Sequence, residues 1–476
     1  MKKIILSLFC SSILLATSCV DSLDDYNISQ KNAAAVPSET LFTSAVKNLT
    51  DALTSASVNS NNYRFYVQHW TATTYLDEPR YNMTSRIIPQ NMWQSLYRDV
   101  LSDLNESKRL VMANTATVEN VKNNQLAQIE IMEVYAWSVL LNTFGDVPYT
   151  QALDPENSLP VYDDAQTTYN AILVRLNDAL TLINATADGF ENGDLLYEGD
   201  MGKWLKFGNS LKLKLAMVIA DVDASQAKTL VEAAAPNVFV SNDDNAVLNY
   251  LSSQPNNNPV SNSVTGIYST REDYIAANTL VDAMNDLNDP RREHFFTQVN
   301  GEYIGGIYGF TNSYPDFSTV SEKVAAPDNN GLLLDYSEVR FLLAEALERG
   351  FTVGGSVEDH YNEGITASIQ YWGGTSDEAD AYLKQSSVDY TTAAGDWKTK
   401  IGTQKWIALY NRGYDAWLEW RRLDAPTLLP PVEGLVVPQR LIYPVNESTL
   451  NGANKNAAAS AIGGDSSETP LWWNAN

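Results

Sequence analysis

Aromatic rings in two polar loops are the side chains of this sequence best suited to bind a ligand. The loops cover residues 55–89 and 300–315, and both are rich in Ser, Asn or Gly. A flat ring covers the apolar C–H face of a sugar and removes about 50 Å² of apolar area from water, worth about 1–1.5 kcal/mol. The candidate binding rings are Trp70, Tyr75, Tyr81, Tyr308, Phe310 and Tyr314.

Stacking of this kind needs several rings and some polar groups. A millimolar complex requires about 4 kcal/mol, so about three stacked rings are needed, or fewer with good hydrogen bonds. Arg80, Asn82 and Asn312 stand near the rings in sequence and are candidate partners for sugar hydroxyls. Loops of this length are unusual inside a compact domain unless they serve a function, although core filling explains each single ring equally well.

The residue arrangements that enzymes use are missing. The three histidines, His69, His294 and His360, form no His-Glu-x-x-His motif, and no phosphate-binding loop or Gly-x-Ser-x-Gly elbow occurs. We therefore assign no catalytic residue and expect no cofactor. The 58 acidic residues supply many chance carboxylate pairs, so an all-α glycoside hydrolase is left open as an alternative.

One acidic cluster is a weak candidate for a metal site. Asp243 and Asp244 stand beside Asn242 and Asn245, and oxygen ligands of this kind suit calcium. The cluster lacks the spacing of a calcium-binding loop, and a solvated turn is the commoner explanation. We leave structural calcium open and assign no metal ligand.

The N-terminal residues have the layout of a targeting signal. Lys2 and Lys3 precede an apolar run over residues 4–16, and small residues then lead to Cys19. This predicts a lipoprotein signal peptide over residues 1–18 and an acylated Cys19 that anchors the protein in outer-membrane lipid. Residues 19–35 are then a flexible acidic tether, and their acidity favours the cell-facing surface. An ordinary secretory signal with a chance cysteine is the alternative.

The composition indicates a large folded body that avoids nucleic acid. The 476 residues have 44 % hydrophobic side chains and a formal net charge of −26. Such a chain can bury a sizeable core, and its charge repels phosphate backbones, so we expect no nucleic-acid binding. The only cysteines are Cys10 and Cys19, which excludes an internal disulfide or a thiolate metal site in the processed chain.

Helices are the elements that must position these residues. Apolar side chains recur every three or four positions, the period of a helix with one buried face. The pattern predicts helices over residues 40–53, 90–113, 126–144, 274–287 and 403–423, with others around Leu173, Leu211, Leu343 and Ile365.

Residue types at the predicted helix ends support these helices. Asp163 and Asp335 stand where N-caps are expected, and Gly145, Gly350 and Gly373 stand where helices are expected to end.

Charged residues on the predicted helices are expected to face water. We expect Glu345 and Arg349 to form an exposed i,i+4 pair, and Lys212 and Lys214 to lie near the outer side of their helix.

Several phrases occur along the chain in a fixed order. They are Phe-Gly-Asp-Val-Pro-Tyr at 144–149, the segment 196–213, Asn-Asp-Pro-Arg-Arg at 288–292, Tyr-Asp-Ala-Trp-Leu-Glu-Trp-Arg-Arg at 414–422, Arg-Leu-Ile-Tyr-Pro at 440–444 and Thr-Pro-Leu-Trp-Trp at 469–473. Behind a lipoprotein leader, this set resembles the SusD/RagB family of nutrient-binding outer-membrane lipoproteins, in its second SusD-like branch. The resemblance covers nearly the whole processed chain.

The resemblance implies an all-α fold of tetratricopeptide-like helix pairs with long irregular ligand-binding loops, in one domain over residues 19–476. It implies a non-enzymatic protein that captures oligosaccharides and delivers them to a SusC-like TonB-dependent β-barrel transporter. Some relatives bind peptides, so an oligopeptide ligand is the alternative, although aromatic, Asn-rich loops favour a glycan. A structural surface protein without a small ligand is a further alternative. We expect the phrases themselves to have a structural role and no binding role, and we expect Glu419, Arg421 and Arg422 to pair with one another.

Overall fold

The computed structural model describes residues 36–475, and helices make up most of its regular structure. Three predictions lie outside the described residues, namely the signal peptide over 1–18, the acylation of Cys19 and the tether over 19–35. From Ser38 onward the described chain forms one compact unit. Between residues 36 and 475, no helix has both the length and the apolar character needed to cross a membrane.

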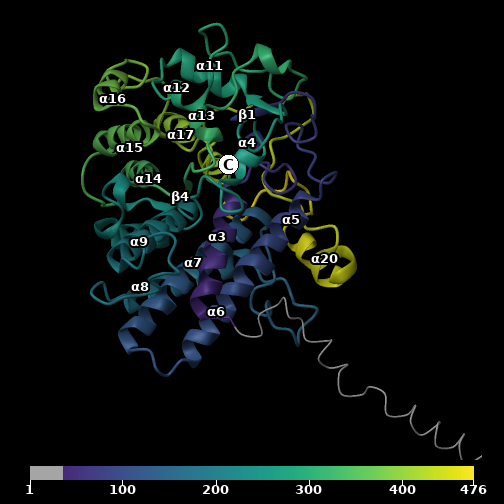
Figure 1. Ribbon diagram of the computed structural model, residues 1–476, viewed down its shortest axis with the longest axis vertical. Coiled ribbons are helices and arrows are strands. Elements are labelled where there is room, and N and C mark those ends of the chain that lie inside the picture. Colours follow the sequence, from purple (N-terminus) through teal and green to yellow (C-terminus); the bar gives the residue numbers. More distant parts are fainter. Residues whose placement is uncertain (1–35, 476) are drawn as a thin grey trace, which may run out of the picture. The chain divides into compact units, whose positions relative to one another are not determined.

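The helices and strands follow one another as Figure 1 shows. The first half contains α3 (Ser38–Thr54), α4 (Tyr63–Tyr66), β1 (Trp70–Ala72), α5 (Ile88–Gln94), the π-helix η1 (Ser95–Leu101), α6 (Ser102–Ala113), α7 (Glu119–Phe144), α8 (Ala165–Leu182), α9 (Met201–Val218), α10 (Ala224–Ala234) and β2 (Ala246–Leu248). The second half contains β3 (Tyr274–Ala276), α11 (Asn278–Asp286), α12 (Arg292–Phe295), α13 (Glu322–Ala325), β4 (Gly331–Leu334), α14 (Tyr336–Glu348), α15 (Val357–Trp372), α16 (Ser376–Leu383), α17 (Trp397–Ala408), α18 (Gly413–Leu423), α19 (Glu447–Leu450) and α20 (Gly452–Ala461).

Consecutive helices pack against each other as pairs. The pairs are α7 with α8, α9 with α10, α14 with α15, and α17 with α18. Figure 1 labels both helices of the first pair and of the third. Each helix buries its apolar face against its neighbour, and α7 is buried along most of its second half. The predicted all-α fold of tetratricopeptide-like helix pairs is confirmed.

Two small antiparallel ribbons interrupt the helical pattern. β1 pairs with β3, so that Trp70 lies opposite Ala276 and Ala72 opposite Tyr274, and β2 pairs with β4. The predicted helix over 274–287 is therefore wrong at its start, because residues 274–276 form β3 and α11 begins only at Asn278. Three residues are too few for a period of two to be distinguished from a period of 3.6.

The predicted helix over 403–423 consists of two helices. α17 ends at Ala408, and the chain turns through Asn411, whose φ is +65°, before α18 begins. A Cβ at Gly413 would lie 2.6 Å from the backbone nitrogen of Arg64. The absence of a side chain at Gly413 therefore lets α18 approach α4 closely.

The predicted helix caps are correct in most cases. Asp335 accepts the backbone N–H of Glu338 at 2.8 Å, and Gly373 ends α15 in the left-handed conformation. Asp163 is not an N-cap, because its carboxylate accepts the backbone N–H groups of Tyr149 and Thr150 and the neighbouring Asp164 caps α8.

Charged residues predicted to face water are buried at the centre of the unit. Glu345 and Arg349 do pair at 2.9 Å, but the Glu345 side chain is fully buried. Lys214 is also buried and lies 3.0 Å from Glu338. Both exposure predictions are wrong. Several neighbouring helices pack around α14 and α9, and they cover helix faces that would be exposed to water in a single helix.

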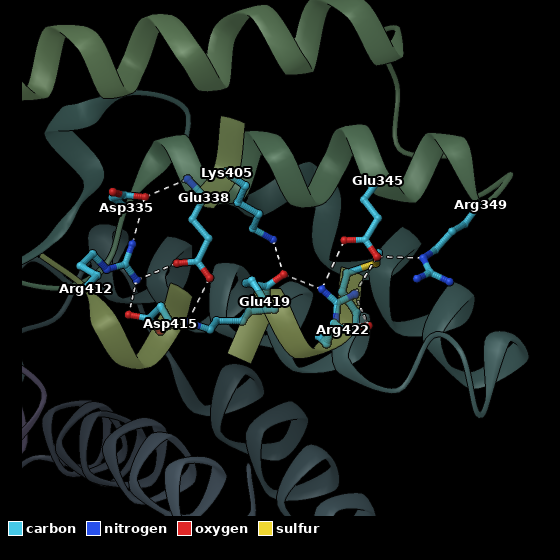
Figure 2. Close-up of polar contacts among 11 residues, drawn as sticks. Asp335, Glu338, Glu345, Arg349, Lys405, Arg412, Asp415, Glu419 and Arg422 are labelled. Atoms are coloured by element: carbon cyan, nitrogen blue, oxygen red, sulfur yellow. Dashed lines mark hydrogen bonds and ion pairs between the residues drawn. The ribbon is translucent and has the colours of Figure 1, made fainter. Parts of the chain in front are cut away.

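Figure 2 shows the ion-pair network that these residues build between α14, α17 and α18. Arg412 lies 2.6 Å from Glu338 and 2.8 Å from Asp415, while Arg422 lies 2.6 Å from both Glu345 and Glu419. The expected pairing of Glu419 with Arg422 is thus confirmed. Arg421 instead stacks on Trp417, with its guanidinium carbon 3.5 Å from the ring centroid.

Burial and neighbouring charge act in opposite directions on Glu338. Burial alone raises the pKa of a carboxyl group, but Lys214 and Arg412 outweigh that effect and lower the pKa of Glu338 to about 2. The network therefore holds Glu338 ionised in the interior and fixes α14 against α9 and α18.

Candidate ligand-binding site

Only part of the predicted set of rings is displayed on the surface. Tyr75 is 56 % exposed and Phe310 is 43 % exposed. Tyr314 is half-buried and donates its hydroxyl to Thr265 Oγ1 at 3.0 Å. The surface rings of the two loops that can face a ligand are therefore Tyr75 and Phe310, with Tyr314 partly covered.

Three of the predicted binding rings are core residues. Trp70 is 1 % exposed, stacks on Tyr274 and donates its Nε1–H to the Tyr410 hydroxyl at 3.2 Å. Tyr81 packs edge-on against Tyr66 and is 8 % exposed.

Tyr308 is the third, with 6 % exposure, and it donates its hydroxyl to the Phe65 carbonyl at 2.7 Å. The prediction that these three rings are displayed is wrong, because tertiary partners distant in sequence cover each of them.

The predicted polar partners serve mainly to hold the loops. Asn312 is buried; its side-chain amide donates to the Ala72 carbonyl, and its side-chain oxygen accepts the Ile307 N–H. Its prediction as an exposed partner is wrong. Asn82 accepts the backbone N–H groups of Thr84 and Ser85 and so stabilises its own turn.

Arg80 links the two predicted loops. Its Nε–H donates to the Gly309 carbonyl at 2.9 Å, and its guanidinium carbon lies 5.6 Å from the centroid of the Phe310 ring. A guanidinium over a ring face is a favourable cation–π contact. Arg80 thus fixes the position of Phe310 from the neighbouring loop.

The ribbon of β1 and β3 brings three distant segments together. Beyond the last strand pair, the Thr73 N–H donates to the Asp273 carbonyl, and the Asn312 N–H donates to the Thr73 carbonyl. Thr73, Asp273 and Asn312, which are distant in sequence, therefore meet at one end of the ribbon.

A hollow of about 420 Å³ lies at this end of the ribbon, and we call it the Tyr75 hollow. It is lined by Val58, Ala72, Tyr75, Glu78, Arg86, Arg271, Asp273 and Tyr274. Two arginines and two carboxylates line it, so its formal charges balance.

One ion pair of the Tyr75 hollow positions the ring. Arg86 pairs with the buried Glu78, and its guanidinium carbon lies 5.7 Å from the centroid of Tyr75. Because Glu78 holds Arg86 in place, the arginine supports the exposed ring rather than reaching for a ligand.

The other charged groups of the hollow, Arg271 and Asp273, form one long ion pair. Arg271 and Asp273 lie 3.8 Å apart, which is beyond hydrogen-bond distance. Within residues 36–475, the Tyr274 hydroxyl has no hydrogen-bond partner, and burial, Asp273 and Glu78 all raise its pKa, so it stays protonated as a donor. The hollow thus offers a ring, a guanidinium, a carboxylate and a hydroxyl.

Seven of the eight residues that line the Tyr75 hollow were not predicted from the sequence. They are Val58, Ala72, Glu78, Arg86, Arg271, Asp273 and Tyr274. Residues 271–273 precede β3 and Tyr274 begins it, whereas the periodicity predicted a helix from residue 274, so the sequence did not indicate that these residues lie next to β1. A strand prediction at 274–276 would have been the signal.

The predicted acidic cluster forms a turn, and two of its side chains accept hydrogen bonds from other groups of the protein. Asp244 accepts from Lys206 Nζ at 2.8 Å and from the Val240 N–H at 2.8 Å, and the Asn245 side-chain oxygen accepts the Tyr336 N–H. In the part of the chain that the structure describes, no group of three or more His, Cys, Asp or Glu residues is arranged to hold a metal ion. Structural calcium stays an open prediction without assigned ligands.

Comparison with protein families decides the classification. The profile of the second SusD-like family, described as starch-binding and associating with the outer membrane, matches residues 30–444. The chain belongs to the SusD-like family. No curated protein sequence matches it.

Solved structures agree with the SusD-like fold, and 74 chains match. A chitin-binding protein is 28 % identical, with a TM-score of 0.78 over 92 % of this chain and 100 % of that chain. A SusD homologue from Bacteroides uniformis is 27 % identical, with a TM-score of 0.76 over 92 % and 99 %. A chitin-binding SusD homologue from Flavobacterium johnsoniae is 23 % identical, with a TM-score of 0.78 over 92 % and 99 %. The predicted family and fold are confirmed.

Proposed function

We propose that this SusD-like protein is a cell-surface lipoprotein that binds oligosaccharides and delivers them to a SusC-like TonB-dependent outer-membrane transporter. The family description, which names starch binding and association with the outer membrane, supports this proposal. The observation that carries it is the Tyr75 hollow, where an exposed, arginine-backed ring lies beside the long Arg271–Asp273 ion pair and the Tyr274 hydroxyl.

The chemistry of the Tyr75 hollow favours a neutral glycan. The ring of Tyr75 covers the apolar face of one sugar, while Asp273, Arg271 and the Tyr274 hydroxyl exchange hydrogen bonds with its hydroxyls. The balanced charge of the lining gives no preference for an acidic or a basic ligand. Phe310, fixed by Arg80, is the second stacking surface.

Chitin oligosaccharides are the first ligands to test, because a structural relative at 28 % identity is a chitin-binding protein. The small apolar side chains of Val58 and Ala72 suit the methyl of an N-acetyl group. Asp273 is placed in the same lining to accept the amide N–H of that group. Starch oligosaccharides, named by the family description, are the second set.

Titration calorimetry of the purified protein with chitin, starch and peptide oligomers tests the proposal. We expect millimolar or tighter binding of one glycan series and a loss of about tenfold in Tyr75→Ala, because one stacking contact is removed. Trp397→Ala is the matched control, since that ring is also backed by an arginine, Arg349 at 5.3 Å, but lies outside the hollow. Binding to peptides alone would overturn the glycan assignment in favour of an oligopeptide ligand.

The protein is proposed to bind its glycan without cleaving it. Chromatography of the oligosaccharides after long incubation should recover them intact. Sustained release of shorter products, abolished by changing one carboxylate pair, would establish the alternative of an all-α glycoside hydrolase.

The membrane anchor and the transporter partner have separate tests. Mass spectrometry of the processed N-terminus should find fatty acyl groups on Cys19. Purification from membranes should recover a large TonB-dependent barrel with the protein, and surface proteolysis of intact cells should reach it. Absence of the acyl groups, or of the barrel, would remove that part of the proposal while leaving glycan binding standing.

A further inference from the structure

Asparagine followed by glycine is a pair at which a protein chain can modify itself, and this sequence contains four such pairs. They are Asn192-Gly193, Asn300-Gly301, Asn330-Gly331 and Asn451-Gly452. The backbone nitrogen of the glycine attacks the side-chain carbonyl carbon of the asparagine, and glycine has no Cβ to hinder the approach. The reaction is fastest where the glycine N–H is not held in a hydrogen bond and the asparagine side chain is free to turn toward it.

Asn300 and Gly301 form a tight hairpin turn at the start of the second polar loop. Val299 donates its N–H to the Glu302 carbonyl at 2.8 Å, and Glu302 donates its N–H to the Val299 carbonyl at 3.1 Å. The two residues between them have φ of +53° and +87°. Asn-Gly is a preferred pair in such a turn, because both central residues need a positive φ. The geometry of the turn therefore explains why this pair stands here.

Both reacting groups of this pair are open to solvent. Asn300 and Gly301 are exposed, and no described atom lies within 4 Å of a Cβ built on Gly301. Within residues 36–475, neither the Asn300 side chain nor the Gly301 N–H makes a hydrogen bond. The side chain of Asn300 can therefore approach the Gly301 nitrogen without giving up a hydrogen bond of its own or displacing another segment.

Two of the other pairs are held by the fold. Asn451 is 6 % exposed, its side-chain amide donates to the Pro160 carbonyl at 2.7 Å, and its side-chain oxygen accepts from Asn454 at 2.9 Å. Gly331 is buried at the start of β4, where an added Cβ would lie 2.6 Å from Thr50 Cγ2. Ring closure at either pair must first break hydrogen bonds or displace packed atoms.

Asn192-Gly193 is the most informative comparison, because Asn192 is exposed like Asn300. Gly193, however, is buried against α3. Its carbonyl accepts the Thr43 hydroxyl at 2.8 Å, and an added Cβ would lie 3.0 Å from the Glu39 carbonyl oxygen. Of the four pairs, Asn300-Gly301 is thus the one that combines a free side-chain amide with an open glycine.

From this comparison we propose that Asn300 is a site of spontaneous deamidation, at which the chain modifies itself without an enzyme. Hydroxide removes the Gly301 N–H proton, and the nitrogen forms a bond to the side-chain carbonyl carbon of Asn300. The C–N bond of the side-chain amide then breaks. The leaving nitrogen takes a proton from water, which regenerates hydroxide, and departs as ammonia. The product is a five-membered succinimide ring.

Water then opens the ring at one of its two carbonyl carbons. Addition at the former side-chain carbonyl gives aspartate with the ordinary backbone. Addition at the backbone carbonyl gives isoaspartate, in which the chain runs through the former side chain of Asn300 and gains one backbone atom. With that extra atom, the two hydrogen bonds between Val299 and Glu302 cannot both persist. Both products add a carboxylate next to this turn.

The change is confined to the turn, because the residues that follow are anchored elsewhere. The Ile304 carbonyl accepts the Ser318 N–H at 2.7 Å, and the Gly306 N–H donates to the Ala276 carbonyl at 2.8 Å. The turn also lies outside the lining of the Tyr75 hollow, so the inference does not rest on glycan binding.

Peptide mapping by mass spectrometry, on protein stored for several weeks at mildly alkaline pH, tests the proposal. Enzymatic methylation with labelled S-adenosylmethionine detects the isoaspartate product. In the folded protein we expect Asn300 to be converted about tenfold or more faster than each of the other three asparagines, because their conversion must first break hydrogen bonds or packing. In protein kept unfolded in guanidinium chloride, all four should be converted at similar rates, since all four share the same dipeptide.

Substitution provides a second readout. Asn300→Gln should abolish conversion at this position, because the longer side chain would have to close a larger ring, and Asn192→Gln is the matched control that should leave conversion of Asn300 unchanged. Hydrogen exchange of the peptide that contains Glu302 should become faster on storage of the natural protein, since the Glu302 N–H loses its acceptor. Stored Asn300→Gln protein should keep the original exchange rate.

Two results would overturn the proposal. One is conversion of Asn300 in the folded protein at a rate no higher than that of Asn192. The other is a rate at Asn300 that rises on unfolding as much as the rates of the other pairs do, which would show that the turn protects the pair instead of leaving it open.

Discussion

Arg86 and Glu78 act on the Tyr75 ring as one unit, since the arginine that lies over the ring is held by the buried carboxylate. Arg86→Gln leaves that carboxylate uncompensated, so we expect a loss of about 2 kcal/mol in the free energy of unfolding. Glu78→Gln and the double variant complete a thermodynamic cycle, for which we expect a coupling energy of about 1–2 kcal/mol.

Urea unfolding of the four proteins measures this cycle, and calorimetry measures the accompanying several-fold loss of glycan affinity. Strictly additive effects of the two substitutions on stability would show that the pair does not hold the ring. The double variant should recover part of the stability that Arg86→Gln loses.

Trp70 and Tyr75 are predicted to respond in opposite ways to substitution. Trp70→Phe removes the hydrogen bond to Tyr410 and part of the contact with Arg64, whose guanidinium carbon lies 5.2 Å from the Trp70 ring. We expect a loss of about 2 kcal/mol in unfolding free energy and unchanged glycan affinity. Tyr75→Ala, on an exposed ring, should lower affinity and leave the thermal midpoint nearly unchanged. If the Trp70→Phe protein had normal stability and weakened glycan binding, Trp70 would have to be part of the binding site.

The residue types showed which aromatic rings stand in the two polar loops, but not which of these rings face water. Tyr75 and Trp70 stand five positions apart in the same polar loop. Their different exposure depends on Tyr274 and Tyr410, which lie hundreds of positions further along the chain. Neither loop has a period that distinguishes a buried side from an exposed one, so only the tertiary contacts separate the two rings.

At the scale of elements, the second loop depends on a close approach to α11. A Cβ at Gly305 would lie 2.4 Å from the Cα and 2.6 Å from the backbone nitrogen of Asn278, distances that no side chain tolerates. Gly305→Ala must therefore push residues 305–310 away from α11, with a loss of about 2 kcal/mol or more in stability and of the Phe310 position.

Gly452→Ala is the matched control, because no described atom lies within 4 Å of its added Cβ and the residue begins α20. Thermal unfolding should show a midpoint several degrees lower for Gly305→Ala and no decrease for Gly452→Ala. Equal midpoints for the two variants would contradict the packing of the loop.

The ion-pair network makes stability depend on acid in a defined direction. The pKa of Glu338 is lowered to about 2 in the folded protein, against an ordinary value near 4.3 in the unfolded chain. Its contribution is complete above about pH 5 and is lost as the pH falls toward 2, because the unfolded chain takes up the proton first. Burial raises the pKa of Asp335, which offsets part of this loss.

Urea unfolding between pH 7 and pH 3 measures this dependence. We expect Glu338→Gln to cost about 3–5 kcal/mol at pH 7, because Lys214 and Arg412 lose a buried partner. The same variant should lose less stability on acidification than the natural protein. An equal pH slope in both proteins would show that Glu338 is not held ionised by the network.

Helices were predictable from this sequence to the extent that each one is long and has a single buried face. α3, α6 and α15 satisfy this condition, and Gly373 marks the end of α15 as expected. β3 was not predicted, because three residues are too few to show a period. Lys214 was predicted to be exposed but is buried, because several helices surround α9 and the sequence pattern of α9 alone does not show them. The local sequence pattern predicts that a segment is helical. How many faces of that helix are buried depends on how many other elements pack against it in the folded protein.

For the whole molecule, the large negative charge predicts how salt affects stability. The formal charge is −26, while the basic residues of the network are buried in balanced pairs that salt screens little. Repulsion between surface carboxylates therefore dominates the salt response, and screening it favours the compact state. We expect the thermal midpoint at pH 7 to rise by several degrees between low salt and about 0.3 M sodium chloride.

The same measurement near pH 4.4, the isoelectric point of the sequence, provides the control. At that pH the net charge is close to zero, so added salt should leave the midpoint almost unchanged. A midpoint that falls with salt at pH 7 would mean that exposed ion pairs, such as Arg109 with Glu106, contribute more than the repulsion does. A rise at pH 7 that disappears near pH 4.4 identifies net charge as the cause, because the buried pairs are present at both values.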